Sequence, residues 1–323
     1  MQILKIELKN VRFIREVVIP FDRITCFMSN EAGSEKHLLN ALGFMSAVAL
    51  RQEEEWLARE KLQWVDFLNA QDSETNPEFV VEVQLAENRY ARWQCTYDLE
   101  KHVRITETLV ESGNPTFSGA EAMEIEEAKG NEDFRKVQQF LGVFVKPEEH
   151  SYDISVDPIK RWPYLSRLTT MVDDMPEEAR EKLLEAMQPL FPGIERLGVR
   201  YWKDGDKSFY YVLNGIRIGE RAMASEDRKV MDIVMGRLSE DNVILLRDVD
   251  NCQPEERYSM LAEYLKKAEK SIIVTSQTPA FARHLVGAFV YEIISGVDGA
   301  VKVLPLESAK AENQKESNLV PAH

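Results

Sequence analysis

A polar loop over residues 29–36 is the first place in the sequence where the chain could handle phosphate. The loop follows a continuous apolar run at 24–28, which is typical of a strand covered on both faces. It precedes a helical pattern that runs from Leu38 toward Phe67. In such a strand–loop–helix unit, backbone N–H groups and the helix N-terminus cradle phosphate, while a lysine and a hydroxyl serve the outer phosphates and Mg²⁺. Residues 29–36 are therefore a candidate phosphate-binding loop.

Two carboxylates, Asp248 and Asp250, follow the apolar run 243–246 and are the second chemical candidate, because carboxylates at a strand end can bind divalent cations. One interpretation is the metal-binding pair of a Toprim-like, metal-dependent nuclease. That fold also needs a glutamate at an upstream strand end and a further βα unit, for which no chain is left after Leu304. We therefore expect Asp250 to cap the following helix or to lie on a loop.

The pattern of apolar residues predicts the elements that must position these side chains. Period-two alternation predicts half-buried strands at 2–9, 13–19, 79–85, 90–97, 103–110, 196–202 and 208–213. From Ala224 onward, helical patterns alternate with apolar runs at 243–246 and 271–275, which is typical of a parallel sheet. We expect 24–28 and 243–246 to be neighbouring parallel strands of one buried sheet that also contains 271–275.

The order of these elements also predicts how the chain divides. Residues 52–175 are expected to form an inserted lobe with a helix, antiparallel strands and an acidic loop. Segments 1–51 and 176–307 are expected to be the N-terminal and C-terminal parts of one core. The polar tail, 308–323, is expected to be disordered, as chain ends of this composition usually are.

The composition limits the partners of the chain. It has 323 residues and a formal net charge of −15, from 55 acidic and 40 basic side chains. Such a surface repels nucleic acid unless a local basic patch offsets it, and basic residues at 196–203 are too sparse to form one in the sequence. Three scattered cysteines without a CxxC pair favour a reducing cytoplasm, and no apolar run reaches membrane-spanning length. We expect a cytoplasmic protein with no membrane contact and no strong sign of direct nucleic-acid binding.

The N-terminal segment resembles the head domains of ABC-type ATPases of the RecF, SMC and OLD-like class, whose loop reads roughly G-P-N-G-S-G-K-S. Laid on without a gap, Ser29, Ala32 and Ser34 stand at the positions of the three glycines. Glu35 takes the position of the lysine, and Lys36 that of the Ser/Thr that binds Mg²⁺. The resemblance thus implies a phosphate-binding loop whose chemistry is inverted.

A register shifted by one residue would match 33–36 to the family's G-S-G-K. It would throw Leu38 and Leu39 out of phase with the helix and leave His37 as the Mg²⁺ ligand, for which an imidazole is poorly suited. We therefore favour the ungapped register.

Three later motifs, A-S-E-D, V-I-L-L-R-D-V-D and T-S-Q-T-P, match the family's signature, Walker B and switch motifs in order and spacing. Ser225 of the signature is kept, but Asp227 stands where the signature glycine would meet the γ-phosphate. Asp248 matches the Walker B aspartate that orders Mg²⁺. Val249 replaces the glutamate that polarises the attacking water, and Gln277 replaces the switch histidine.

The resemblance covers about residues 1–50 and 176–304 and implies the fold. We expect an α/β ABC-type ATPase head, P-loop NTPase-like, in which an antiparallel N-terminal sheet lies beside a mostly parallel core sheet flanked by helices. Segments 1–51 and 176–307 then form the ATPase-like core.

Four altered motifs on a retained scaffold predict a non-catalytic pseudo-ATPase, a structural or regulatory interaction subunit in DNA maintenance or anti-phage defence. We expect no catalytic residue and no cofactor, and a protein partner such as an active ATPase or nuclease subunit; a homodimer would form without nucleotide. The first alternative is a divergent Mg²⁺-dependent ATPase that uses ATP, Asp248 and Lys36 in the lysine role. The second is the nuclease, with metal at Asp248 and Asp250.

Overall fold

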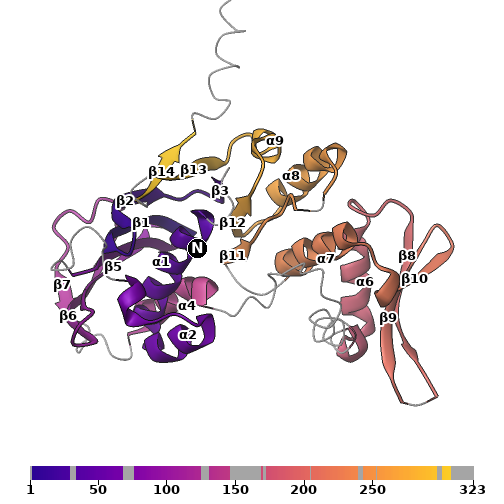
Figure 1. Cartoon of the computed structure of the whole chain (residues 1–323), viewed down its shortest axis with the longest axis horizontal. Helices are drawn as coiled ribbons and strands as arrows, with labels where there is room; N and C mark the ends of the chain where they lie inside the picture. The colour runs from indigo at the N-terminus through magenta and orange to yellow at the C-terminus, as the bar shows by residue number, and fades with distance from the viewer. Residues whose placement is uncertain are drawn as a thin grey trace, which may run out of the picture.

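Three β-sheets follow one another across the molecule, with helices packed between and beside them (Figure 1). The computed structural model describes residues 2–29, 34–67, 76–124, 131–145, 169, 172–203, 205–238, 243–251, 253–296 and 300–306. The tail at 308–323, predicted to be disordered, lies outside these ranges. Within them, no helix combines the length and the apolar character needed to cross a membrane.

The largest sheet is antiparallel, with strand order β2-β1-β4-β5-β6-β7. In β5, buried side chains alternate with partly exposed ones, so that one face of the sheet covers a core and the other is accessible to solvent. The strands are β1 (Gln2–Val11), β2 (Ile14–Pro20), β4 (Glu78–Ala86), β5 (Arg89–Asp98), β6 (Val103–Ser112) and β7 (Ala122–Glu124). The expected antiparallel N-terminal sheet is thus present.

Strands β4 to β7 come from the segment 52–175, which the sequence predicts to be an inserted lobe. In the structure β4 pairs directly with β1, so these strands extend the N-terminal sheet and do not form a layer of their own. The alternation in β1 indicates which of its faces is buried. It does not indicate which strand will hydrogen-bond to its second edge, and the sequence therefore leaves this pairing open.

The central sheet has strand order β11-β12-β3-β13-β14, in which the first four strands are parallel and β14 is antiparallel. All six residues of β3 are buried, as its continuous apolar run predicts. The strands are β3 (Ile24–Ser29), β11 (Val243–Leu246), β12 (Ser271–Ser276), β13 (Phe289–Ser295) and β14 (Val301–Pro305). The prediction that β3 and β11 are neighbours is wrong, because β12 lies between them and pairs with both.

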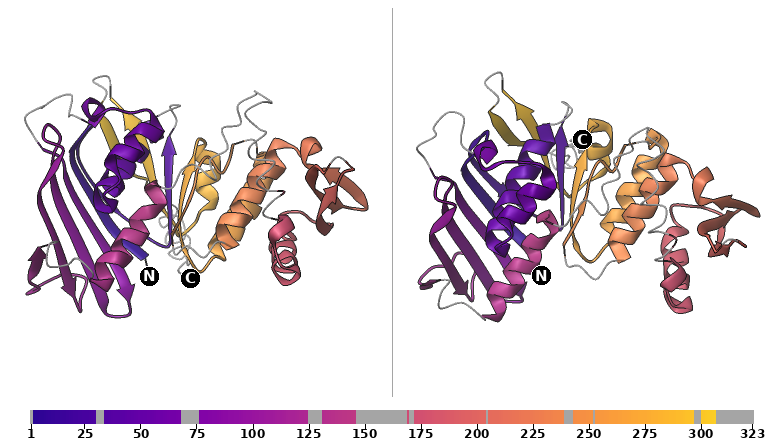
Figure 2. Two further views of the ribbon diagram at one scale, coloured as in Figure 1. Left: turned by 90° about the horizontal axis from the view of Figure 1, so that it is seen from below. Right: turned by 60° about the horizontal axis from the view of Figure 1, so that its bottom comes forward.

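Three helices fill the space between these two sheets (Figure 2). They are α1 (Ser34–Leu50), α2 (Glu53–Glu60) and α4 (Glu132–Val145), followed after α2 by a short 3-10 helix at Trp64–Phe67. Helix α1 ends earlier than its pattern predicts, because Arg51 adopts a left-handed conformation with φ 63°. The N–H of Gln52 then closes the helix on the carbonyl of Ala47 at 2.9 Å.

A second core lies on the other face of the central sheet, where alternate residues of β3, β11 and β12 meet a different set of helices. These are α6 (Glu177–Met187), α7 (Ser225–Leu238), α8 (Tyr258–Lys266) and α9 (Pro279–His284). Beyond α6 and α7 lies a three-stranded antiparallel sheet of β8 (Ile194–Tyr201), β9 (Lys207–Leu213) and β10 (Ile216–Gly219). The helices thus flank both faces of the central sheet.

Candidate functional site

The candidate site lies at the carboxyl ends of β3, β11 and β12, the edge at which open α/β sheets bind ligands. Helix α1 begins close to this edge, so the strand–loop–helix unit predicted from the sequence is present. Ser29 is the buried last residue of β3. Of the other loop positions, Ala32 lies outside the described residues, and of Ser34 only the backbone is described.

Glu35 and Lys36 stand in the first turn of α1 and differ in their surroundings. Lys36 is exposed, whereas Glu35 is half-buried and its Oε2 is shielded from solvent without a hydrogen-bond partner among the described residues. The N-terminus of a helix carries a partial positive charge that attracts anions. Here the protein supplies its own anion, the Glu35 carboxylate, at the helix end that would otherwise face a bound phosphate.

Arg247 follows β11 directly and brings a cation into this edge of the sheet. Burial lowers the pKa of its guanidinium below the usual value, while the carboxylates of Glu60, Asp248 and Glu35 act on it in the opposite direction. Its backbone carbonyl accepts a hydrogen bond from the buried ammonium of Lys229 on α7. The sequence analysis gave Arg247 no role, although its position next to Asp248 could have drawn attention to it.

Asp248 and Val249 point in different directions. Asp248 has a left-handed backbone with φ 46°; its N–H donates to Thr275 Oγ1 at 2.7 Å, and that hydroxyl donates to Asp248 Oδ1 at 3.3 Å. Val249 is fully buried in the second core, and its N–H donates to the carbonyl of Thr275 at 3.0 Å. A side chain at position 249 therefore enters the core and does not reach the edge of the sheet.

Asp250 joins the loop after β11 to the loop after β12. Its buried carboxylate accepts hydrogen bonds from the N–H of Gln277 at 3.1 Å, the N–H of Thr278 at 2.8 Å and the hydroxyl of Ser276 at 2.9 Å. Thr278 in turn caps α9, where its side chain accepts from Phe281 N–H. Asp250 therefore ties these two loops together. Among the described residues, no group of three or more His, Cys, Asp or Glu side chains could hold a metal ion.

The signature residues begin helix α7, as predicted. The carboxylate of Asp227 already has partners within its own chain. Asp227 Oδ2 accepts a hydrogen bond from the hydroxyl of Tyr211 at 2.7 Å, and Oδ1 lies 3.5 Å from Arg257 Nη1. Burial, and then the hydrogen bond to Asp227, raise the pKa of the Tyr211 hydroxyl. Ser225, the first residue of α7, is half-buried, and the side chain of Gln277 is exposed at the edge beyond β12.

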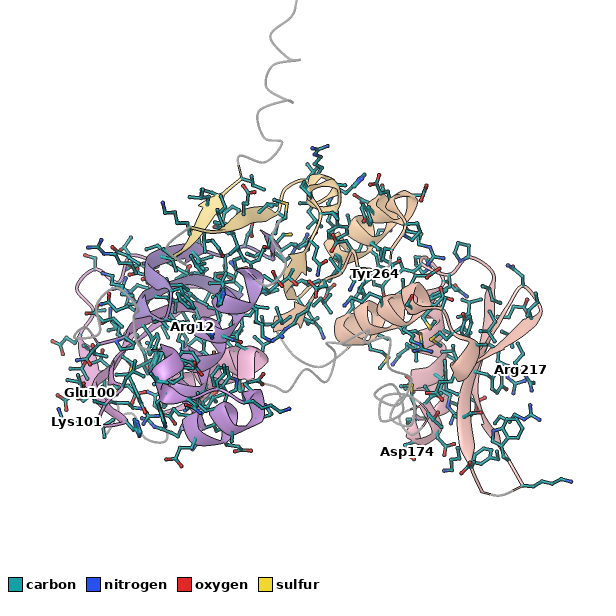
Figure 3. All side chains as sticks on the ribbon, in the orientation of Figure 1. Arg12, Glu100, Lys101, Asp174, Arg217 and Tyr264 are labelled. Atoms are coloured by element: carbon teal, nitrogen blue, oxygen red, sulfur yellow. The ribbon has the colours of Figure 1, made fainter. Side chains whose placement is uncertain are left out.

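Arg12, in the turn between β1 and β2, is a further residue that the sequence analysis missed. Burial lowers the pKa of its guanidinium, and its Nε and Nη1 are shielded from solvent without a hydrogen-bond partner among the described residues. Its charge acts on His37 in the first turn of α1, whose Nδ1 is also shielded and unpartnered there. Figure 3 shows Arg12 at the side of the molecule that carries α1. Nothing in a local pattern marks such a side chain, because its guanidinium also packs against the ring of Phe67, which is distant in the sequence.

The three sheets, the helices between them and the strand-end motifs together define the fold of an ABC-type ATPase head. Among solved structures, the chain resembles an SMC head bound to the C-terminal winged-helix domain of ScpA, with TM-score 0.61 and 14% identity over 98% of this chain and 100% of that one. The SMC head of Thermotoga maritima gives TM-score 0.54 and 11% identity over 95% of this chain and 100% of that one.

A third similar structure is the Pyrococcus furiosus Smc head with an extended coiled coil, bound to the C-terminal domain of ScpA. It gives TM-score 0.55 and 15% identity over 98% of each chain. No model of a known protein family matches the sequence, and no curated protein matches it. The likeness therefore establishes the fold, and the predicted ABC-type head with its two sheets is confirmed.

Proposed function

We propose that this protein is a non-catalytic ABC-type head that serves as a structural or regulatory interaction subunit. The observation that carries the proposal is the Glu35 carboxylate, which stands in the first turn of α1 with one oxygen shielded from solvent. A carboxylate and a phosphate oxygen roughly 4 Å apart repel each other by about 4 kcal/mol at an effective dielectric constant near 20. That is a loss of about three powers of ten in affinity for nucleotide.

Arg247 supports the same proposal from the other side of the site. Because Val249 is buried in the core, we shift the register of the Walker B motif by one residue. Arg247, the first residue after β11, then takes the position of the aspartate that orders Mg²⁺, and Asp248 that of the glutamate that polarises water. A guanidinium at that position repels a divalent cation, and the carboxylates of Glu60 and Glu35 interact favourably with its charge.

The signature end of α7 adds a third argument. In an active head pair, the nucleotide held by one head meets the signature of the other, so this helix end must be free to accept it. Here Asp227 places a negative charge at that end and is engaged by Tyr211 and Arg257 of its own chain. ATP therefore has no favourable contact with which to bridge two copies, and any homodimer is expected to form without nucleotide.

A head domain that keeps its fold but has lost the residues for ATP hydrolysis would act by binding another protein. Two of the similar structures, both SMC heads, are bound to domains of ScpA. By fold-level analogy alone, the partner of this chain would be another subunit of such an assembly, for example an active ATPase or a nuclease, in DNA maintenance or anti-phage defence.

One observation favours a second candidate, a divergent Mg²⁺-dependent ATPase. Arg12 has shielded donors without partners close to the first turn of α1, and an anion there would satisfy them. Together with the exposed Lys36, Arg12 could supply the positive charge that Glu35 removes. The nuclease finds no such support, because both oxygens of Asp250 already accept hydrogen bonds.

A thermal-shift titration separates these candidates. The pseudo-ATPase predicts no change of melting temperature with ATP·Mg²⁺ or with Mn²⁺ alone. A shift with ATP·Mg²⁺ that disappears in Lys36→Met, but persists in the exposed control Lys302→Met, would establish the divergent ATPase. A shift with Mn²⁺ that disappears in Asp248→Asn would establish the metal-dependent enzyme.

A further inference from the structure

The outer face of the three-stranded sheet brings together arginines that are dispersed in the sequence. Strand register places Arg196 of β8 opposite Val212 of β9, and Val212 opposite Arg217 of β10, so these three side chains form one row on the same face. With neighbouring strands 4.7–4.9 Å apart, the two arginines that flank the row stand roughly 10 Å from each other. Arg200 lies on the same face, four residues along β8 from Arg196.

The opposite face of this sheet is closed, which makes the arginine face the accessible one. Leu197, Phe209 and Tyr211 point into the second core toward α6 and α7. Arg196, Arg200 and Arg217 are all exposed, and Figure 3 shows Arg217 on the side of the sheet away from α6. A bulge at Glu195, between the pairs of Ile194 and Arg196, sets the phase that turns the arginines outward.

Two of the arginines lie over aromatic rings. The guanidinium carbon of Arg200 lies 3.8 Å from the ring centroid of Trp202, and that of Arg217 lies 4.4 Å from the ring centroid of Tyr210. The indole of Trp202 is 45% exposed and is fixed by its Nε1–H, which donates to Ser208 Oγ at 3.1 Å. Planar cations supported in this way lose little conformational entropy when they bind an anion.

One glycine, Gly198, leaves room for the ring of Tyr210 at the centre of this face. Tyr210 is flanked across the strands by Gly198 and Gly219. A Cβ atom on Gly198 would come within 2.7 Å of the Tyr210 hydroxyl, so a larger residue at this position would displace the ring. Tyr210 itself is buried beneath the guanidinium of Arg217. Glu195, the carboxylate next to Arg196 at the bulge of β8, accepts a hydrogen bond from the N–H of Gly215 at 2.8 Å.

We propose that this arginine–aromatic face, made of Arg196, Arg200, Trp202, Tyr210 and Arg217, binds single-stranded nucleic acid. The three arginines make this face positive and therefore complementary to a phosphate backbone, whereas the chain as a whole carries a net charge of −15. An acidic peptide would use only the arginines of this face and would leave the aromatic ring without a role. The exposed indole adds a π-surface on which a base can stack, and bases in a single strand are free to do so whereas those in a duplex are not.

The test is fluorescence anisotropy with the full chain and a fluorescein-labelled oligothymidylate of about 20 nucleotides, at salt concentrations from about 50 to 200 mM. Three phosphate contacts predict that log K falls with log salt concentration with a slope of about −2. The triple variant Arg196→Ser, Arg200→Ser, Arg217→Ser should bind at least 30-fold more weakly and lose most of this slope. Trp202→Ala should weaken binding about tenfold, because one stacked base is lost.

A matched control removes the same charge elsewhere. Arg15, Arg283 and Lys302 are exposed and lie outside this face, so their combined change to serine should leave binding nearly unaltered. Equal weakening in both triple variants, or no binding by the wild-type chain at the lowest salt, would overturn the proposal. So would duplex DNA binding as tightly as the single strand, or poly-L-glutamate displacing the oligonucleotide at equal charge concentration, which would point to an acidic protein partner.

Discussion

The carboxylate of Asp250 and the hydroxyl of Thr278 lie 2.7 Å apart and connect two loops that are 28 positions apart in the sequence. The same carboxylate also receives the N–H groups of Gln277 and Thr278. The switch-like segment after β12 is thus fixed by a residue that follows β11. This connection ties the loop after β11 to the loop after β12 at the edge of the central sheet.

Replacement of Asp250 by alanine should therefore destabilise the fold strongly. The carboxylate is only 4% exposed, and its loss leaves several buried donors without an acceptor, so we expect the free energy of unfolding to fall by about 3 kcal/mol. Asp250→Asn keeps one acceptor oxygen and should cost about half as much. Urea denaturation measures both. The control is Asp174→Ala at an exposed position, and its urea midpoint should match that of the wild type. If Asp250→Ala also had the wild-type midpoint, the structural role of the Asp250 carboxylate would be refuted.

Tyr211 and Asp227 should be energetically coupled. Tyr211 is 1% exposed and donates its hydroxyl to a carboxylate, a contact stronger than a neutral hydrogen bond. A double-mutant cycle of Tyr211→Phe and Asp227→Asn in urea should give a coupling free energy of about 1 to 2 kcal/mol. A coupling indistinguishable from zero would show that Asp227 is free at the signature end of α7, contrary to our account.

The sequence could predict the core strands, because unbroken apolar runs such as β3 and β12 mark strands buried on both faces. It could also predict the strand-end motifs, since Glu35, Asp227 and Asp248 stand beside elements that fold as expected. These features depend on local periodicity, which a single sequence carries directly.

The rest depends on contacts between distant segments. Nothing local shows that β12 separates β3 from β11, or that Val249 turns into the core while Asp248 does not. The segment 196–203 does not reveal the basic face of the three-stranded sheet, because Arg217 joins this face only through the pairing of β10 with β9. Strands β13 and β14 also lay outside the predicted elements.

The stability of the fold should fall as the pH drops below about 6.5. Burial, with the charges of Arg12 and Lys36, lowers the pKa of His37 below its usual value of 6.5. Between the lowered pKa and 6.5, the unfolded chain binds more protons than the folded protein, so the free energy of unfolding decreases with decreasing pH. In chemical denaturation between about pH 7 and about pH 5.5, His37→Gln should flatten this dependence. The exposed His284, changed to Gln, should leave it as in the wild type; an unchanged slope in His37→Gln would remove His37 as its source.

The oligomeric state should not respond to ATP. With Glu35 and Asp227 at the two surfaces that a nucleotide would bridge, ATP adds repulsion rather than attraction between copies. Light scattering should give the same molar mass with and without millimolar ATP·Mg²⁺. A monomer that becomes a dimer only when ATP is added would contradict this prediction.

Calorimetric titration of ATP·Mg²⁺ into the protein tests the pseudo-ATPase proposal most directly. The repulsion at Glu35 and the guanidinium of Arg247 at the metal position predict no measurable heat of binding at millimolar nucleotide, and no phosphate release above a buffer blank. Micromolar affinity that is lost in Lys36→Met but kept in Lys302→Met would contradict the proposal and identify the protein as a divergent ATPase.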